Sequence, residues 1–214
     1  MTTELSTQRL IGLTGGIASG KTTVSNYLAT AYQLLVLDAD IYAREAVSVG
    51  SPALIAIARR YGGEILLPDG TLNRQRLGEI VFNSPQERRW LEQLIHPAVR
   101  DRLVEAISLS PHMVLVIPLL FESGMTDLVT EIWVVHCSQQ QQIERLMQRS
   151  KLTPEAAQAR IDSQMPLAEK CDRADVVLDN SSTLEVLLQQ VDAAIALPLK
   201  KSSFPNTTAT DLVE

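Results

Sequence analysis

Residues 15–22 have the types and spacing needed to bind a polyphosphate. They read Gly-Gly-Ile-Ala-Ser-Gly-Lys-Thr, with two glycines five positions apart and Lys-Thr directly after the second. Glycines let the backbone turn tightly, so that successive N–H groups point at the phosphates of a nucleotide, and the helix that follows adds its positive N-terminal end. We expect Lys21 to reach the β- and γ-phosphates and the Thr22 hydroxyl to bind Mg²⁺.

A second candidate group is the acidic pair Asp38 and Asp40, which follows a short apolar run. Ligands of α/β proteins bind beyond the carboxyl ends of the strands, and a carboxylate there can orient an acceptor hydroxyl and take its proton during phosphoryl transfer. The alternative is an acidic pair that caps a turn, but the nearby P-loop favours the catalytic interpretation. Arg44, one helical turn after Asp40, is expected to face the same cleft.

Arginines gather in a third region, where Arg145 and Arg149 share one face of a predicted helix. Arg160 and Gln164 repeat this spacing on the next predicted helix, after a turn at residues 152–154. Such a hairpin resembles a lid whose guanidinium groups neutralise charge on a transferred phosphoryl group. A solvated charged surface is the alternative, and the position after the fourth predicted strand favours the lid.

The elements that must position these groups alternate along the chain, because short apolar runs are separated by helical patterns. The runs are nearly continuous in Val, Ile and Leu, which is typical of parallel strands covered by helices on both faces. The predicted fold is therefore α/β, with a five-stranded parallel sheet. The predicted strands are residues 10–14, 34–37, 114–117, 132–135 and 176–178.

Several helix starts carry capping signals. Ser51 and Thr153 each precede a proline suited to the first helical position. Ser84 and Glu87 have the spacing of a full capping box, which predicts a helix through Trp90 and Leu94. One crossover helix needs far fewer residues than lie between the second and third strands, so residues 44–111 are expected to hold an inserted helical lobe.

Composition limits the possible function classes. The chain has 214 residues, which suits one domain, and a net charge of −6, which argues against a dedicated nucleic-acid binder. Its two cysteines form no disulfide framework, the N-terminus lacks a signal-peptide pattern, and the longest apolar run, residues 113–121, is too short to span a membrane. We therefore expect a soluble cytoplasmic protein, with a mobile tail at residues 198–214.

The P-loop alone does not identify the class of nucleotide-binding protein. The chain has neither the Asn-Lys-x-Asp nor the Asp-x-x-Gly motif of a GTPase. Its third predicted strand ends in Pro118 rather than in the acidic residue of a motor-type ATPase, and the nearest acid is Glu122. A small-molecule kinase remains.

An ordered set of motifs then resembles the dephospho-CoA kinase family. The set covers nearly the whole chain apart from the two termini, and its order is far more specific than the P-loop alone. It consists of residues 13–23, Asp-Ala-Asp-Ile-Tyr-Ala-Arg from Asp38, His96-Pro97, residues 118–122, Gln148-Arg149, Arg160 with Gln164, and Asn180-Ser181.

The resemblance implies an activity and a division of the site. ATP would phosphorylate the 3′-hydroxyl of the dephospho-CoA ribose in the last step of coenzyme A synthesis, with a parallel-sheet core, a helical CoA-side lobe, and a lid at about residues 139–170. The implied catalytic residues are Asp40, Lys21 and Arg149. Substrate binding would fall to Asp38, Arg44, His96 and Glu122. ATP would be bound by Gly16, Ile17, Ala18, Ser19, Gly20, Lys21, Thr22, Thr23, Arg145 and Asn180.

One departure from the family pattern is Ala18, where glycine is common. Alanine is expected to keep the loop and the activity provided that its φ angle is negative. His96 also has a purely structural interpretation, because His-Pro often lies near a helix end.

The expected partners are ATP with Mg²⁺ and dephospho-CoA, without nucleic acid or membrane, and the oligomeric state is left open. Two other functions remain open as well. One is a kinase for a different small hydroxyl acceptor, and the other is a non-catalytic ATP-dependent switch, against which the acidic pair argues.

Overall fold

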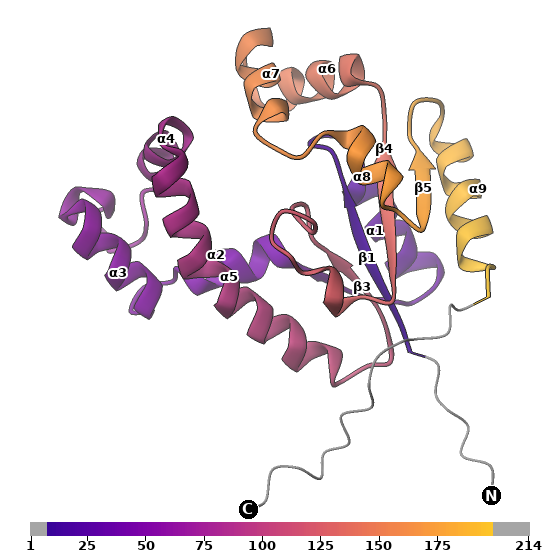
Figure 1. Cartoon of the computed structure of the whole chain (residues 1–214), viewed down its shortest axis with the longest axis horizontal. Helices are drawn as coiled ribbons and strands as arrows, with labels where there is room; N and C mark the ends of the chain where they lie inside the picture. The colour runs from indigo at the N-terminus through magenta and orange to yellow at the C-terminus, as the bar shows by residue number, and fades with distance from the viewer. Residues whose placement is uncertain (1–7, 199–214) are drawn as a thin grey trace, which may run out of the picture.

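The apolar runs pair into one parallel sheet of five strands, in the order β2-β3-β1-β4-β5. The structure is a computed structural model that describes residues 8–198, so the predicted mobile tail lies, from residue 199 on, outside the described residues. The predicted five-stranded parallel sheet is confirmed (Figure 1). The strands are β1 (Arg9–Gly15), β2 (Leu35–Asp38), β3 (His112–Val116), β4 (Glu131–His136) and β5 (Val176–Asp179).

The register of the sheet brings the functional segments to one edge. β1 lies in the middle, with β3 on one side and β4 on the other. Its last residue, Gly15, lies opposite Val135 of β4, while Asp38 at the end of β2 lies opposite Val116 of β3. The P-loop and the acidic pair therefore leave the sheet at the same edge, because all five strands point the same way.

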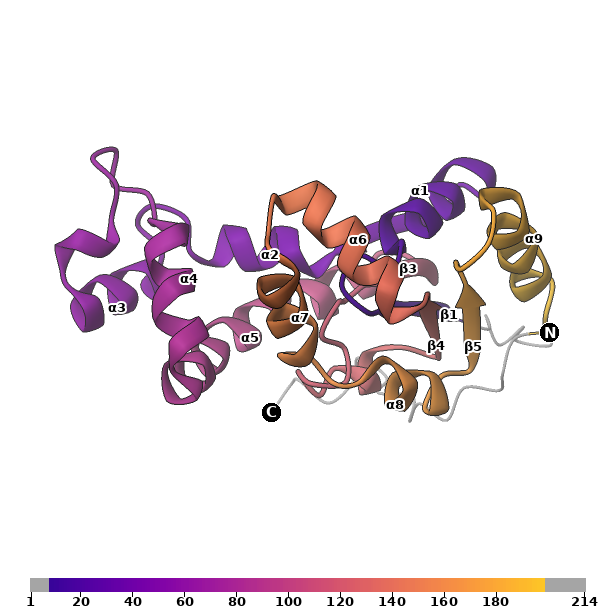
Figure 2. The same ribbon diagram turned by 90° about the horizontal axis from the view of Figure 1, so that it is seen from above.

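One face of the sheet is covered by α1 (Lys21–Ala31) and α9 (Leu184–Ile195), as Figure 2 shows from above. Val24 and Leu28 of α1 are fully buried together with Leu187 and Val191 of α9. Within each helix these side chains are four residues apart, so each helix buries one stripe.

The other face is covered by α2 (Ala39–Ala46), the C-terminal half of α5 (Pro85–Ile107), a 3₁₀ turn η2 (Thr126–Leu128), and α8 (Leu167–Asp172) beside β4. Val99 and Leu103 of α5 pack into the core formed with β3. Although α5 is 23 residues long, neither it nor any other helix between residues 8 and 198 is long and apolar enough to cross a membrane.

The part of the chain that connects β2 to β3 forms a helical lobe, which projects from the sheet (Figure 1). It contains α2, α3 (Pro52–Tyr61), a 3₁₀ turn η1 (Gly63–Ile65), α4 (Arg74–Asn83) and the N-terminal half of α5. The lobe has its own apolar core, separate from the two cores on the sheet. That core is formed by Val47, Ala53, Leu54, Ile57, Ile65, Leu72 and Leu77.

The predicted capping box at the start of α5 is only half formed. Ser84 Oγ accepts a hydrogen bond from the backbone N–H of Glu87, as expected. The Glu87 carboxylate, however, accepts from Arg60 Nε at 2.7 Å and from the Tyr61 hydroxyl instead of turning back to Ser84. Tertiary contacts with α3 therefore replace the second capping bond. The helix itself is as predicted and continues through Pro97.

The helices after β4 are α6 (Gln139–Ser150) and α7 (Pro154–Asp162). Ser138 and Gln141 form a complete capping box at the start of α6, which the sequence analysis missed. Thr153 caps α7 as predicted. Because α7 ends at Asp162, Gln164 lies in the segment that leads to α8, and its predicted place on the helix is wrong.

The conformation expected for Ala18 in the P-loop is wrong. Its φ angle is +58°, in the left-handed region, whereas the sequence analysis required a negative φ. A non-glycine residue pays about 1 kcal/mol for this conformation. The loop is nevertheless tied across this position, because Ser19 N donates to Gly16 O at 3.2 Å.

We predict that Ala18→Gly leaves the free energy of unfolding unchanged or raises it by up to about 1 kcal/mol, since glycine removes the left-handed strain but adds chain entropy to the unfolded state. Urea denaturation measures this. The matched control is Ala29→Gly in the helix α1, which should lower the free energy of unfolding by about 1 kcal/mol. An equal loss in both variants would contradict the strain at Ala18.

Candidate active site

The carbonyl groups of the P-loop are held by side chains from distant parts of the chain. Gln142 Nε2 on α6 donates to Ile17 O at 2.8 Å, and Asn180 Nδ2, just after β5, donates to Ser19 O at 2.8 Å. Arg145 Nη2 in turn donates to Asn180 O at 3.0 Å. The loop is therefore fixed in shape by α6 and by the end of β5.

These contacts explain why two loop positions are glycine. A Cβ atom on Gly16 would lie 2.1 Å from Gln142 Nε2, and one on Gly20 would lie 2.2 Å from Asn180 Nδ2. Gly20 also has a φ of +111°, which side chains rarely adopt. Glycine is therefore required at these two positions by close contacts as well as by the turn of the backbone.

Lys21 lies over the loop that precedes it. Its Nζ donates to Gly16 O at 2.8 Å and to Gly15 O at 3.2 Å. Burial, and then the positive charge of Lys170, lower the pKa of Lys21 to about 8, although the Asp40 carboxylate acts in the opposite direction. An anion bound here would reverse this shift, because it would favour the charged ammonium.

The two carboxylates at the start of α2 have different roles. Asp38 Oδ1 accepts a hydrogen bond from Asp40 N at 2.8 Å and so caps the helix. Asp40 opens to the cleft, yet desolvation by the surrounding protein, and then the charge of Asp38, raise the pKa of its carboxyl. Arg44 and Lys21 oppose that shift. Asp40 is therefore a more basic carboxylate than an ordinary aspartate.

One cleft of about 470 Å³ brings most of the predicted residues together. We call it the P-loop cleft. The loop and α1 supply one wall, the acidic pair a second, and α6 a third. Its lining residues are Ile17, Ala18, Gly20, Lys21, Thr22, Asp38, Asp40, Val116, Pro118, Leu119, Arg145, Arg149 and Gln164.

Several predicted residues lie outside this lining: Gly16, Ser19, Thr23, Arg44, His96, Glu122 and Asn180, together with Arg160. Asn180 is behind the loop, on Ser19 O. Arg160, which was grouped with the lid arginines, lines a different cleft, described below. His96 lines a smaller, mainly apolar pocket of about 200 Å³, but Asp40 lines that pocket as well, so the pocket adjoins the P-loop cleft at the carboxylate.

Glu122 forms an ion pair that its sequence position did not suggest. Its Oε1 accepts from Lys170 Nζ at 2.8 Å and from Met165 N at 3.0 Å. The Lys170 side chain is fully buried and also donates to Pro118 O at 3.2 Å. Glu122 thus anchors the segment that follows α7, and its predicted contact with the substrate remains a prediction.

Lys170 and Gln142 are site residues that sequence reasoning missed. A lysine in a six-residue helix gives no sign of burial, and Gln142 belongs to a run of four glutamines. The one available signal was the capping box at Ser138, which fixes the first turn of α6 and so directs Gln142 at the loop.

The donor set fits a magnesium ion shared with a polyphosphate. Mg²⁺ usually takes one or two carboxylates, with water and phosphate oxygens completing its octahedron. Thr22, Asp38 and Asp40 line the same cleft and supply a hydroxyl and two carboxylates. Between residues 8 and 198, no three His, Cys, Asp or Glu side chains gather to hold a metal without such a ligand.

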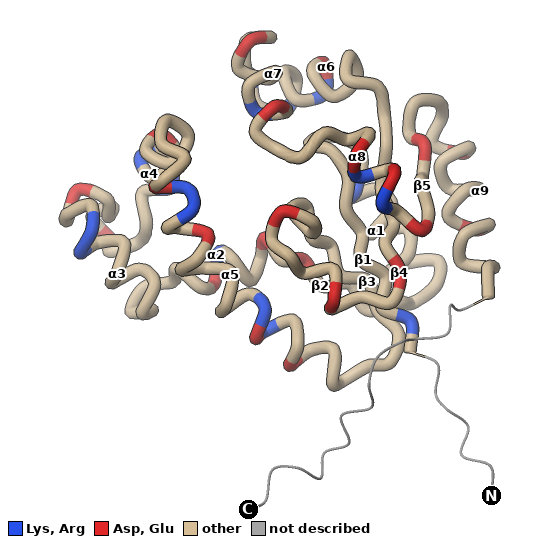
Figure 3. The backbone as a smooth tube through the Cα atoms, in the orientation of Figure 1, with Lys and Arg blue, Asp and Glu red and all other residues tan. Residues whose placement is uncertain are grey.

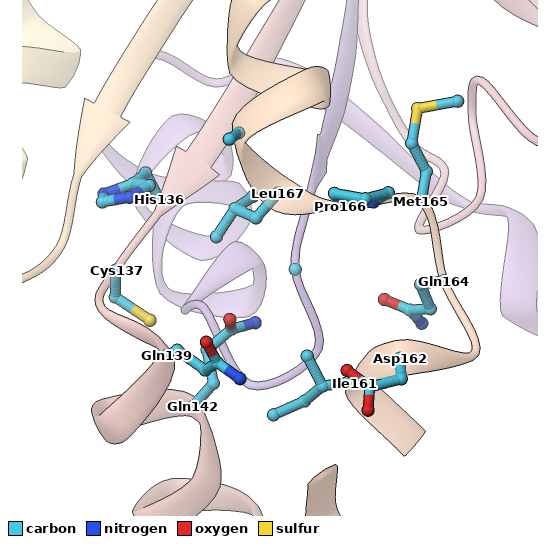
Figure 4. Close-up of a pocket in the computed structure, with 12 residues that line it drawn as sticks. His136, Cys137, Gln139, Gln142, Ile161, Asp162, Gln164, Met165, Pro166 and Leu167 are labelled. Carbon is cyan, nitrogen blue, oxygen red and sulfur yellow. The ribbon is translucent and has the colours of Figure 1, made fainter. Parts of the chain in front are cut away.

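A further cavity of about 460 Å³ lies between the end of β4, the start of α6 and the segment joining α7 to α8 (Figure 4). His136 and Cys137 come from β4 and the turn after it, while Pro166 and Leu167 face them from the N-cap and the first position of α8. Among residues 8–198, no lysine or arginine lines this cavity.

Comparison with known proteins agrees with this geometry. The family model described as dephospho-CoA kinase matches residues 9–185. A dephospho-CoA kinase of Trichormus variabilis is 68% identical over 195 residues, covering 90% of this chain and 100% of the relative.

Solved structures give the same result. A crystal structure from Thermus thermophilus has a TM-score of 0.75 and 36% identity, covering 88% of this chain and 97% of its own. The dephospho-CoA kinase from Campylobacter jejuni has a TM-score of 0.65 and 29% identity, covering 87% and 94%. With its P-loop, acidic pair and parallel sheet in the arrangement described, the chain belongs to the dephospho-CoA kinase family.

Proposed function

We propose that this protein transfers the γ-phosphoryl group of ATP to the 3′-hydroxyl of the dephospho-CoA ribose, giving CoA and ADP. The observation that carries the proposal is the P-loop cleft, in which Lys21, Asp40 and Arg149 line the same space. Phosphoryl transfer depends mainly on positioning and on charge stabilisation, and this cleft offers two cations together with a basic carboxylate.

On the nucleotide side, the loop N–H groups and the start of α1 receive the phosphates. Lys21 exchanges its bonds to the Gly15 and Gly16 carbonyls for bonds to phosphate oxygens. Arg149 neutralises charge on the group in transfer, and Arg145 with Asn180 flanks the adenosine. Mg²⁺ bound through Thr22 would neutralise further charge on the phosphates.

On the acceptor side, the 3′-oxygen of the ribose attacks the γ-phosphorus. The bond from that phosphorus to the β–γ bridging oxygen breaks, ADP leaves, and the hydroxyl proton passes to Asp40. Asp38 keeps the first turn of α2 in place through its bond to Asp40 N. The apolar pocket that Asp40 shares with His96 adjoins this point and receives part of the acceptor.

The remaining assignments follow from this reaction. Residues 139–170 act as the lid that excludes water, residues 44–111 form the acceptor-side lobe, and the whole chain works as one kinase domain. A cytoplasmic location suits an enzyme that uses ATP and a coenzyme A precursor. The two cysteines, Cys137 and Cys171, are free thiols, as they would be there.

The direct test is a coupled assay for ADP with identification of the product. Purified protein with ATP, Mg²⁺ and dephospho-CoA should form CoA, while a nucleoside monophosphate in place of dephospho-CoA should not be phosphorylated at a comparable rate. Asp40→Asn should reduce kcat by about 100-fold or more with little change in ATP affinity. Turnover of the monophosphate alone would identify a different kinase, and ATP binding without any transfer would indicate a switch protein.

The lowered pKa of Lys21 makes ATP binding depend on pH. The nucleotide requires the charged ammonium, so affinity should fall as pH rises through about 8 and be roughly tenfold weaker at pH 9 than at pH 7. Calorimetry at pH 7, 8 and 9 measures this. Lys21→Arg keeps its charge over that range and should give an affinity independent of pH. An equal pH dependence in the variant would assign the effect to another group.

Substitutions of the charged residues around Asp40 should move the pH midpoint of kcat/KM, on its acid side, either up or down. A base must be deprotonated, so kcat/KM should fall as pH drops through the raised pKa of Asp40. Arg44→Ala removes a positive charge and should move the midpoint to higher pH. Asp38→Asn removes a negative charge while keeping a capping oxygen, and should move it to lower pH. Shifts in the same direction would exclude Asp40 as the titrating base.

A further inference from the structure

The basic side chains of this protein divide into two groups by their partners. Between residues 8 and 198, seven lysines and arginines lie within 4.0 Å of a carboxylate: Arg9, Arg60, Arg76, Arg100, Arg102, Lys170 and Arg173. Within the same range no carboxylate pairs with Lys21, Arg145 and Arg149, which line the P-loop cleft. An unpaired cation beside a cleft is free to bind an anion.

Three further arginines of this unpaired kind converge on a second cleft. Arg74 comes from α4, Arg88 from the first turns of α5, and Arg160 from the end of α7, and together they line a space of about 580 Å³. Figure 3 shows basic positions on these helices, on either side of the gap between lobe and lid. In the part of the chain that the structure describes, none of the three has a carboxylate partner; Arg74 Nη2 donates only to Arg44 O, at 3.3 Å.

We call this space the arginine cleft, and it adjoins the P-loop cleft. Leu119 and Gln164 line both spaces. Gln164 stands between α7 and α8, so the segment after α7 borders both clefts. An extended ligand bound in one cleft therefore lies next to the other.

The charge of the arginine cleft is positive, although the protein carries a net charge of −6. Two carboxylates, Glu79 and Glu92, also line it, and within residues 8–198 neither pairs with a basic side chain. Glu79 instead accepts a hydrogen bond from Gln75 at 3.2 Å. Three cations against two anions leave a positive surplus. The P-loop cleft has the same balance of three cations and two carboxylates, whereas no lysine or arginine among residues 8–198 lines the cavity of Figure 4.

The chemistry of the acceptor identifies the anion, and this step rests on the proposed function. In dephospho-CoA, a diphosphate is attached to the 5′-carbon of the same ribose whose 3′-hydroxyl is phosphorylated. When the 3′-hydroxyl lies at Asp40, the diphosphate must lie several ångströms to one side, and the P-loop is then occupied by ATP. The arginine cleft is the adjoining space with unpaired cations.

We propose that Arg74, Arg88 and Arg160 bind the diphosphate of the acceptor. Guanidinium groups suit this task because each can donate two parallel hydrogen bonds to a phosphate. Two of the three come from the helical lobe and one from α7. The bound diphosphate therefore joins lobe and lid, so that the acceptor, as well as ATP, closes the lid over the reaction.

The test compares one variant from each side of the cleft, Arg88→Ala on the lobe and Arg160→Ala on the lid, in the full-length protein. Each should raise the KM for dephospho-CoA at least fivefold, since a hydrogen bond to a charged group is lost, while the KM for ATP stays within twofold. Arg59→Ala is the matched control, because Arg59 on α3 is exposed, has no carboxylate partner within residues 8–198 and does not line the arginine cleft, so its KM values should not change.

A rise of less than fivefold in either variant, or an equal rise in the KM for ATP, would overturn the proposal. Calorimetric titration of dephospho-CoA into the protein loaded with a non-hydrolysable ATP analogue gives the same comparison without turnover. A wild-type protein that binds dephospho-CoA but forms no CoA would contradict the proposed function, whereas wild-type turnover with unaffected variants would contradict the diphosphate site alone. Circular dichroism spectra that match the wild type establish that the variants fold.

Discussion

The hydrogen bonds to the P-loop carbonyls are the constraint on which the site depends. A loop that keeps its N–H groups for phosphate must satisfy its carbonyl oxygens elsewhere, since an unpaired polar group in a buried place costs free energy. Gln142 and Asn180 supply these donors from α6 and from the end of β5. The first helix of the proposed lid, α6, is therefore hydrogen-bonded to the P-loop. A movement of α6 must change the position of the loop.

The basic side chains around the P-loop differ in whether a carboxylate neutralises them. The buried Lys170 is balanced by Glu122, which fixes the segment after α7 to the loop after β3. Lys21, Arg145 and Arg149 have no such partner within the described residues, and burial together with the charge of Lys170 lowers the pKa of Lys21. Basic side chains that no carboxylate of the protein neutralises can instead bind the negatively charged substrates.

The sequence predicted the features that depend on neighbouring residues. The five strands are continuous apolar runs, and the P-loop and the helix caps at Ser51 and Thr153 are local patterns, so all of them were found. Features that a distant residue decides could not be predicted from the neighbouring sequence. Glu87 turns to Arg60 and not to its own helix cap, Ala18 is held at a positive φ, and the burial of Lys170 depends on Glu122.

The central claim is that one ribose hydroxyl lies at Asp40 between two phosphate-binding clefts. A crystal structure with dephospho-CoA and a non-hydrolysable ATP analogue with Mg²⁺ tests it most directly. We expect the 3′-oxygen within about 3 Å of an Asp40 carboxylate oxygen, with the triphosphate in the P-loop and the acceptor's diphosphate among Arg74, Arg88 and Arg160. A 3′-oxygen held by another residue, or a diphosphate bound away from these arginines, would contradict it.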